Sequence, residues 1–263
     1  MPILRRKHHW GQALDNSTYV SLSLATALRR EMDVAANNMA NANTTGFKAE
    51  RVVFSSYLHN DPAAATGDTN FLVDVGSYVD ARQGALSQTG NLLDVALKGD
   101  GWFGYQTAQG QRAYGRDGSL AIDPQGNLVT LTGARILDIG GNPIALPPDV
   151  GADLTISRSG VISSLTNGVI GQIGVFGLPD LQAYERIGNG MFVAPDVDGI
   201  RPPVPDTVTE VIQGALEGSN IQPVVEMTRM MTIQKAYERA VQLMNSEDEL
   251  RRDMLRRIGS PSG

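Results

Sequence analysis

The residues of this chain that most readily suggest catalysis are four aspartates: Asp94, Asp100, Asp117 and Asp123. A pair of carboxylates supplies the acid and the base in most glycoside hydrolases. All of these aspartates except Asp94 lie in or beside a Gly or Pro turn signal, where Asp commonly bonds to nearby backbone. We therefore predict turn residues here. A secreted, β-rich carbohydrate-active enzyme is kept as an alternative, with Asp94 and Asp117 as its candidate residues.

Two other patterns suggest a cofactor or a metal. Residues 99–104 read GDGWFG, which has the glycine spacing of a dinucleotide-binding turn. Such a turn opens a helix and is followed about 20 residues later by an acidic residue. Strand and turn residues follow here instead, so we predict a tight glycine turn. The histidines (His8, His9 and His59) lack carboxylates spaced around them as metal ligands. The sequence therefore predicts no catalytic residue, no metal site and no cofactor.

Composition narrows the possible classes of protein. The chain has 263 residues, a formal net charge of −6, a hydrophobic content of 41% and no cysteine. This is enough apolar material for a core, and an acidic chain lacks the basic face of a nucleic-acid-binding protein. The lack of cysteine excludes disulfides and thiol chemistry. No apolar run is long enough to span a membrane. Because Arg5, Arg6 and Lys7 precede polar residues, we expect no cleaved signal peptide.

The elements that would position any site begin with a helix predicted over residues 16–45. Its apolar residues recur at intervals of three or four and so line one face. They are Leu24, Leu28, Met32, Ala35 and Met39. We expect Gly46 to take a left-handed conformation after the last turn and Phe47 to fold back on the helix end. An apolar face this narrow suits packing on other helices better than it suits a core.

The end of this helix is rich in asparagine, with Asn37, Asn38, Asn41 and Asn43. Asn lies below Ala in helix propensity by roughly 0.6 kcal/mol per residue. Several such residues together indicate that side-chain amides are needed there more than local stability. We predict that these amides form an interaction surface, and the alternative is a frayed polar helix end.

The middle of the chain predicts strands. Residues 49–81 carry a weak pattern, from which we expect an extended connector with a mobile loop at 60–68. From residue 82 onward, short apolar runs alternate with Asp-Gly, Asn-Gly and Pro turn signals. Strands of about five residues at this spacing predict an antiparallel β domain of hairpins, as a small sandwich or open barrel. The strongest single hairpin prediction is at Asn167-Gly168.

A second long helix is predicted over residues 223–258. A strand at 207–212 and a turn precede it, with Ser219 or Asn220 as the candidate N-cap. Its apolar residues follow a repeat close to 3.5 residues. They include Ile233, Tyr237, Ala240, Met244 and Leu250. Since neither helix is stable alone, we predict that the two pair as a coiled-coil-like arm. The predicted fold class is therefore α+β, with long terminal helices and a central antiparallel β domain.

The predicted organisation has six parts. Residues 1–14 form a loose extension, 15–45 the first helix and 46–82 the connector. Residues 83–205 form the central β domain, 206–221 a return strand and turn, and 222–263 the second helix, which pairs with 15–45. Before assembly both helices lack partners, so we expect them to fray.

Several motifs carry a family resemblance. Residues 36–48, ANNMANANTTGFK, strongly resemble the amino-terminal signature of flagellar axial proteins, the rod and hook family. Three more stretches look like parts of that family: GALSQTGNLLDVALKGDGWF at 84–103, AYGRDGSL at 113–120 and QGALEGSN at 213–220. Residues 15–23 are most similar to proximal rod members, with distal rod members as the near alternative. The departures are the extension before Asp15, and Gly115 where Thr is common.

The resemblance implies a structural subunit without enzymatic activity. Such proteins build the hollow rod of the flagellar basal body across the periplasm, and they leave the cell through the flagellar type III export apparatus without a cleaved signal. Their terminal helices line the inner tube, with the β domain outside. The implied partners are self-copies, other proximal and distal rod proteins and the export apparatus. A heterologous contact repeated along an axis produces such a polymer. A viral tail or baseplate subunit would use the same contact and is a further alternative.

The predicted subunit interface takes in the apolar faces of both helices and the asparagine-rich end with its cap. Its residues are Leu24, Leu28, Met32, Asn37, Asn38, Met39, Asn41, Asn43, Gly46, Phe47, Met227, Met231, Tyr237, Ala240, Met244 and Leu250.

Overall fold

The computed structural model describes residues 10–59, 69–148, 150 and 153–259. The chain divides into two compact units. The helical unit comprises the described residues of 1–39, 50–78 and 223–263. The β unit comprises 40–49 and the described residues of 79–222.

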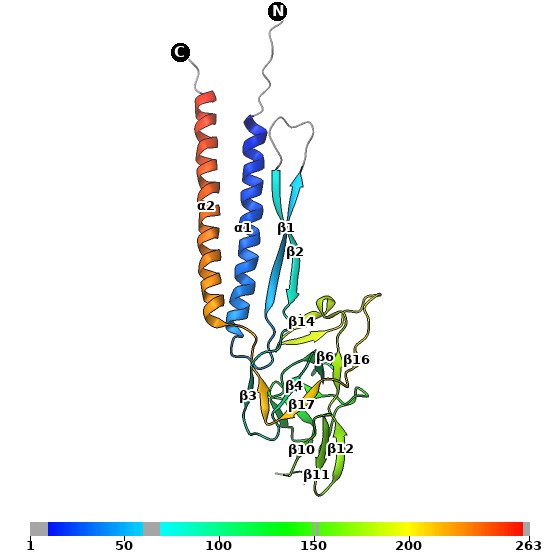
Figure 1. Ribbon diagram of the computed structural model, residues 1–263. Helices are drawn as coiled ribbons and strands as arrows, with labels where there is room; N and C mark the ends of the chain where they lie inside the picture. Colours follow the sequence, from blue (N-terminus) through cyan, green and yellow to red (C-terminus); the bar gives the residue numbers. More distant parts are fainter. Residues whose placement is uncertain (1–9, 60–68, 149, 151–152, 260–263) are drawn as a thin grey trace, which may run out of the picture. The chain divides into compact units, whose positions relative to one another are not determined.

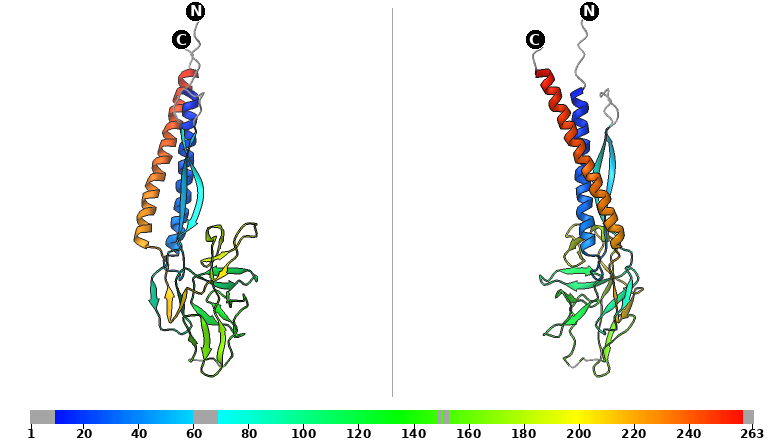
Figure 2. Two further views of the ribbon diagram at one scale, coloured as in Figure 1. Left: turned by 45° about the vertical axis from the view of Figure 1, so that its right-hand side comes forward. Right: turned by 90° about the vertical axis from the view of Figure 1, so that its left-hand side faces the viewer.

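The helical unit contains two helices and a pair of strands. Helix α1 (Trp10–Ala40) and helix α2 (Pro223–Gly259) run in opposite directions (Figure 1). Strands β1 (Glu50–His59) and β2 (Thr69–Val79) form a two-stranded sheet beside α1, as Figure 2 shows from two further sides. The two predicted terminal helices are therefore present. Among the described residues, neither is both long and apolar enough to cross a bilayer.

The bounds of α1 differ from the predicted range of 16–45. The helix already begins at Trp10, within the stretch expected to be a loose extension, because Gln12, Ala13 and Leu14 are good helix formers. It ends at Ala40, because the residues at 41–45 read NANTT and such side chains favour turns over helix interiors.

The segment expected to be an extended connector is largely paired. Strands β1 and β2 hydrogen-bond to each other, and the ladder is continued by the Asp80 N–H, which donates to the Ala49 carbonyl at 2.8 Å. The mobile loop predicted at 60–68 lies outside the described residues. Both strands carry the aromatic and β-branched residues that favour strands, but no short turn signal between them indicates that they pair with each other.

Helix α2 buries side chains at a seven-residue spacing: Glu226, Ile233 and Ala240. Seven residues equal two turns of a slightly underwound helix, so these positions share one face. Helix α1 likewise buries a set of small or polar side chains, namely Ser21, Ala25, Ala27, Ala35 and Asn38.

The β unit is built almost entirely of short strands. These are β3 (Leu86–Gln88), β4 (Val95–Lys98), β5 (Trp102–Gln106), β6 (Arg112–Gly115), β7 (Leu120–Ile122), β8 (Leu128–Thr130), β9 (Arg135–Ile136), β10 (Thr155–Ile156), β11 (Val161–Ser164), β12 (Gly168–Gln172), β13 (Val175–Gly177), β14 (Glu185–Ile187), β15 (Met191–Val193), β16 (Val204–Pro205), β17 (Glu210–Gln213) and β18 (Ala215–Glu217), with one 3₁₀ turn, η1 (Leu181–Ala183).

The strands of the β unit pair antiparallel throughout. The largest sheet has the order β14-β15-β6-β5-β9-β8-β7, and β13 pairs with both β5 and β16. A three-stranded sheet follows the order β10-β11-β12, and two separate pairs join β17 to β4 and β18 to β3. The predicted hairpin at Asn167-Gly168 is the turn between β11 and β12, where Ser164 pairs with Gly168. The predicted central antiparallel β domain is therefore confirmed.

The core of the β unit is a continuous apolar cluster contributed by most of its strands. Phe103, Tyr105, Ile136 and Ile162 are among its fully buried side chains. The glycine string at 99–104 enters this core as β5. A Cβ on Gly104 would lie 2.7 Å from the Phe176 ring, so glycine allows the close approach of β13.

Candidate functional site

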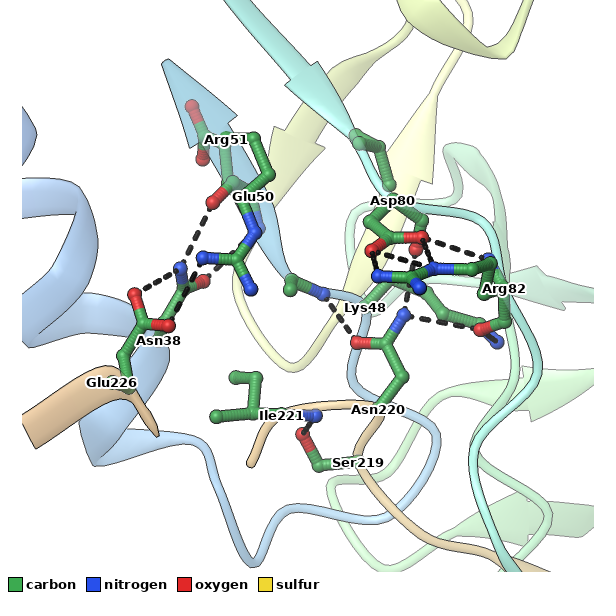
Figure 3. Close-up of polar contacts among 12 residues, drawn as sticks. Asn38, Lys48, Glu50, Arg51, Asp80, Arg82, Ser219, Asn220, Ile221 and Glu226 are labelled. Atoms are coloured by element: carbon green, nitrogen blue, oxygen red, sulfur yellow. Dashed lines mark hydrogen bonds and ion pairs between the residues drawn. The ribbon is translucent and has the colours of Figure 1, made fainter. Parts of the chain in front are cut away.

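The two helices and the first strand of the helical unit meet at one asparagine. Asn38 of α1 is fully buried, and its Oδ1 accepts the Glu50 N–H at 3.0 Å while its Nδ2 donates to the Glu50 carbonyl at 2.9 Å (Figure 3). The amide therefore pairs with the start of β1 as a neighbouring strand would. Nδ2 also lies 3.3 Å from Oε1 of Glu226, whose Oε2 is 3.0 Å from the Arg51 guanidinium. One side chain thus links α1, β1 and α2.

A second contact joins the helices one to two turns away. The guanidinium of Arg229 on α2 donates to Glu31 Oε1 on α1 at 2.7 and 3.1 Å. Both side chains are partly exposed. An ion pair of this kind contributes at most about 1 kcal/mol. The amide of Asn38 is therefore the buried link between the two helices, and this ion pair is the partly exposed one.

The β unit contains a matching asparagine just before α2. The Asn220 Oδ1 accepts the Ala49 N–H at 2.8 Å, and its Nδ2 donates to the carbonyls of Asp80 and Arg82 at 2.8 and 3.0 Å (Figure 3). Its own backbone N–H donates to the Phe47 carbonyl at 3.3 Å. Both N–H donors of the amide and its oxygen are therefore in use. The sequence predicted Ser219 or Asn220 as a helix cap, and Asn220 instead ties three separate segments of the chain together.

Beside Asn220 lies a buried cluster of charges. Glu217 Oε1 is 2.6 Å from Lys48 Nζ and accepts the Gly84 N–H at 2.9 Å, while its Oε2 is 3.1 Å from Arg116 Nη1. Lys48 also donates to the Arg82 carbonyl at 2.8 Å. The three charged side chains are 1% exposed or less. Burial lowers the pKa of Lys48, and Glu217 opposes that shift. A carboxylate between two cations keeps charges that are costly to desolvate from being buried alone.

The predicted cap residues lie in the same part of the β unit. Gly46 has the expected left-handed conformation, with a φ of +67°, but it lies six residues after the end of α1 and so does not cap that helix as predicted. A Cβ at this position would lie 2.3 Å from the Arg116 carbonyl carbon, so only glycine fits. Phe47 is buried against Ala49 and Ile221, and the Arg186 guanidinium stands 4.5 Å above its ring. Gly46 and Phe47 therefore anchor the chain inside the β unit.

The sixteen residues predicted for a subunit interface fall into three groups by exposure. The exposed ones are Leu24, Asn37, Asn43, Met227, Met231 and Leu250. The half-buried ones are Leu28, Met32, Met39, Asn41, Tyr237 and Met244. The buried ones are Asn38, Gly46, Phe47 and Ala240. The sequence alone did not single out Lys48, Arg116, Glu217 or the amide contacts of Asn220. A lysine directly after Gly46-Phe47 was the one local signal, because a charge beside a buried aromatic needs a partner.

An exposed apolar patch lies on the first turns of α2. Val224, Met227 and Met231 are 77%, 55% and 56% exposed. Their spacing of three and four residues places them on one face of the helix. Ile233, by contrast, is buried. On α1, the exposed residues Asp33, Ala36 and Asn37 form a face of short side chains near Asn38. The helical unit therefore exposes both large and small side chains at the level where its helices meet.

The candidate catalytic aspartates are engaged in turns. Asp94 accepts from the side chains of Thr89 and Asn91 at 2.6 and 3.0 Å. Asp117 accepts the Ser119 N–H at 3.0 Å, and burial raises the pKa of its carboxyl group. Asp123 accepts backbone N–H groups two and four residues ahead. In the described part of the chain, no group of three or more acidic or histidine residues is arranged to hold a metal ion.

Three parts of the chain resemble known protein families. Three family models match the chain: "Flagella basal body rod protein" at residues 19–48, "Flagellar hook protein FlgE/F/G D1 domain" at 96–164 and "Flagellar basal body rod FlgEFG protein C-terminal" at 212–257. The first model covers Asn38, Gly46 and Phe47. The last covers Glu217, Asn220 and most of α2.

Whole-chain relatives carry the same names. The flagellar basal-body rod protein FlgF of Caulobacter vibrioides is 38% identical over 94% of this chain and 99% of its own length. FlgF of Mesorhizobium japonicum is 34% identical over 95% of this chain and 100% of its own length. The flagellar basal-body rod protein FlgG of Agrobacterium fabrum is 30% identical over 85% of this chain and 92% of its own length.

Proposed function

The chain belongs to the family of flagellar basal-body rod proteins, and from this premise we propose how it is built into the rod. It is a structural subunit of the basal body, where it assembles with other rod subunits, and it is not an enzyme. The carbohydrate-active alternative, with Asp94 and Asp117 as its candidates, is not favoured by the family.

We place the chain in the proximal rod. The support is the similarity of residues 15–23 to proximal rod proteins and the two FlgF relatives at 38% and 34% identity. A distal position is the alternative, since an FlgG relative is 30% identical. Basal bodies purified from cells that lack the distal rod proteins should still contain this chain if it is proximal. Its absence from those particles would favour the distal position.

We propose that the chain polymerises through the helical unit, with α1 and α2 pairing as a coiled-coil-like arm in the assembled rod. Within one chain the helices are joined by Asn38 with Glu226 and by Glu31 with Arg229. The seven-residue spacing of the buried positions on α2 supports such pairing. Once the rod has formed, the half-buried residues of the predicted interface, such as Met32 and Tyr237, contact both the partner helix and the next subunit.

The single observation that carries the polymer contact is the exposed patch of Val224, Met227 and Met231. Burial of a side chain of this size contributes about 1.5–3 kcal/mol. We propose that this patch packs on the short side chains around Ala36 of α1 in a neighbouring copy. Because Asn38 touches Glu226, both surfaces lie at one level of the antiparallel helices, so neighbouring copies would meet side by side. The two surfaces differ, so the contact is heterologous and can repeat without closing.

We further propose that the chain reaches the rod through the flagellar type III export apparatus and that the rod it joins crosses the periplasm. The support is the family alone. The proposal predicts that the chain appears in the culture medium of hook-deficient cells only when that apparatus is intact.

The decisive experiment replaces both methionines of the patch, as Met227→Asp with Met231→Asp. We expect loss of swimming and of incorporation into basal bodies, with an unchanged thermal unfolding curve of the purified chain. The matched control is Leu165→Asp, since Leu165 is 92% exposed in the turn after β11 and lies outside the proposed contact. Normal swimming of the double variant would refute the proposed contact.

A further inference from the structure

The chain passes between its two units four times, after residues 39, 49, 78 and 222. On the β-unit side these passages leave three segments: 40–49, 79–82 and 217–222. Each is followed or preceded by an element of the helical unit, namely α1, β1, β2 or α2. The relative positions of these three segments therefore decide where every element of the helical unit begins or ends.

Asn220 holds all three segments with one side chain. Its amide accepts from Ala49 and donates to Asp80 and Arg82, and its backbone N–H reaches the Phe47 carbonyl. These bonds span 140 and 171 residues of sequence between Asn220 and its amide partners at positions 80 and 49. No local turn accounts for such a set of contacts.

A second set of bonds joins the same three segments. Lys48, in the first segment, is bonded to Glu217 in the third and to the Arg82 carbonyl in the second. The backbone adds two more links, from the Gly46 N–H to the Glu217 carbonyl at 2.7 Å and from the Asp80 N–H to the Ala49 carbonyl at 2.8 Å. The three segments are thus joined pairwise, by groups that belong entirely to the β unit.

We propose that Asn220, with the buried Lys48–Glu217 pair, is a register clamp that fixes where α1 and β2 end and where β1 and α2 start, before those elements are stably folded. This rests on the proposed function, because it concerns how the helical unit folds when the chain joins the rod. The clamp keeps positions 49 and 220 adjacent, which removes the entropic cost of bringing two distant helices together during assembly. The high effective concentration that results favours pairing of α1 with α2 over pairing with a wrong partner.

The test compares Asn220→Ala with Asn91→Ala in the full chain. Asn91 is the matched control because its amide also uses both ends within the β unit, yet it bonds only to Leu93 and Asp94 in its own segment. Each variant is purified for hydrogen exchange and thermal unfolding, and each is expressed in cells that lack the native chain.

Exchange is read at the N–H groups of Gly46 and Asp80, which connect the segments without touching the Asn220 side chain. We expect Asn220→Ala to speed exchange at both by about tenfold and Asn91→Ala to leave it unchanged. Incorporation into basal bodies should fall by about fivefold for Asn220→Ala alone, at a similar unfolding temperature in the two variants. If Asn220→Ala does not fold, Asn220→Ser takes its place, since its hydroxyl keeps part of the bonding.

The outcomes separate the clamp from the proposed function. Failure of the unmodified chain to enter basal bodies would refute the rod assignment. If the unmodified chain enters and Asn220→Ala enters equally well, the clamp is refuted and the rod assignment stands. Unchanged exchange at Gly46 and Asp80 in Asn220→Ala would refute the clamp as well.

Discussion

The helical unit and the β unit bury different kinds of side chain. Buried positions in the β unit are mostly large and apolar, as at Phe103, Tyr105 and Ile162. In the helical unit they are mostly small or polar, and Ile233 is the one large aliphatic residue below 9% exposure among the side chains that the structure describes. Burying a large apolar side chain contributes about 1.5–3 kcal/mol. The β unit therefore has its own source of stability, while the helical unit depends on polar links and, in the proposed rod, on contacts with other chains.

Asn38 and Asn220 differ in the same way as the two units that contain them. Asn38 and Asn220 both bond to backbone groups as a strand would. Asn220 does so beside a full core and a buried charge cluster, whereas Asn38 is itself the main link of its unit. The same side-chain chemistry thus supports a stable unit in one place and substitutes for a core in the other.

The largest effect should come from removing the carboxylate at the centre of the buried charges. Glu217→Ala leaves Lys48 and Arg116 buried without their common partner, and we expect a loss of about 3–5 kcal/mol in the free energy of unfolding. Urea denaturation of the purified chain measures this. Half-buried Glu210→Ala is the control, since its ion pair with the exposed Arg158 is 3.8 Å long. An unchanged urea midpoint would mean that this charge cluster does not stabilise the β unit.

A pair of isoleucine replacements tests the comparison directly. Ile162→Ala opens a cavity in the β-unit core and should cost about 2–5 kcal/mol of unfolding free energy in the monomer. Ile233→Ala should leave the main unfolding transition within about 0.5 kcal/mol of its original value, because the helical unit contributes little to it. Ile233→Ala should instead lower the helix content measured by circular dichroism. Equal losses from the two replacements would show that the units unfold as one.

Asn38→Leu addresses the polar link of the helical unit. It leaves the N–H and carbonyl of Glu50 and the Glu226 carboxylate without the amide, and groups of this kind cost about 1–3 kcal/mol each when buried unpaired. Helix content should fall and incorporation into basal bodies should be lost. Asn245→Leu, which is exposed on α2 and lies outside the proposed contact, is the control for the change in chemistry. Retained helix content in Asn38→Leu would contradict the role given to the amide.

The smallest expected effect is the pH dependence of stability that Asp117 contributes in its turn. Burial raises the pKa of Asp117 above its ordinary value of 3.8, so the folded chain binds this proton more tightly than the unfolded chain. Stability contributed by this group is present below pH 3.8 and is lost as the pH rises through the folded-state pKa. Asp117→Asn should therefore raise the unfolding temperature at neutral pH and have no effect in strong acid.

Asp123 supplies a control of opposite sign. The hydrogen bond from Asn127 is the main reason that the pKa of Asp123 lies below 3.8. Its charged form therefore stabilises the fold above that pH, and Asp123→Asn should lower the unfolding temperature at neutral pH. If Asp117→Asn and Asp123→Asn shifted the unfolding temperature in the same direction, the opposite pKa shifts given to the two aspartates would be contradicted.

Features that depend on residues close together in the sequence could be predicted from it, and features that depend on residues far apart could not. The two terminal helices and the antiparallel β domain are signalled locally, by apolar spacing around Leu24 and Leu28 and by turn pairs such as Asn167-Gly168. The left-handed Gly46 is equally local. The pairing of β1 with β2 was missed, because neither segment shows a clear alternation of apolar and polar residues in the sequence.

The candidate site was harder to predict than the fold. The Asn38 amide meets a carboxylate 188 residues away, and the Lys48–Glu217 pair spans 169 residues. The local pattern around Asn220 suggested an N-cap, since Ser and Asn before a helix usually serve that purpose. Only the three-dimensional arrangement shows that its amide is directed to Ala49, Asp80 and Arg82 instead.

The meeting of three segments at Asn220 has a consequence for how such chains diversify. A unit whose incoming and outgoing strands converge on one small patch is an interchangeable cassette, because its size and decoration can vary without moving its attachment points. Insertions in the strands and turns far from residues 46–49, 80–82 and 217–220 leave that attachment intact. The β unit could be exchanged between related subunits by cutting both chains at these three segments. The resulting chimaeras should keep the helical unit of one parent and the β unit of the other.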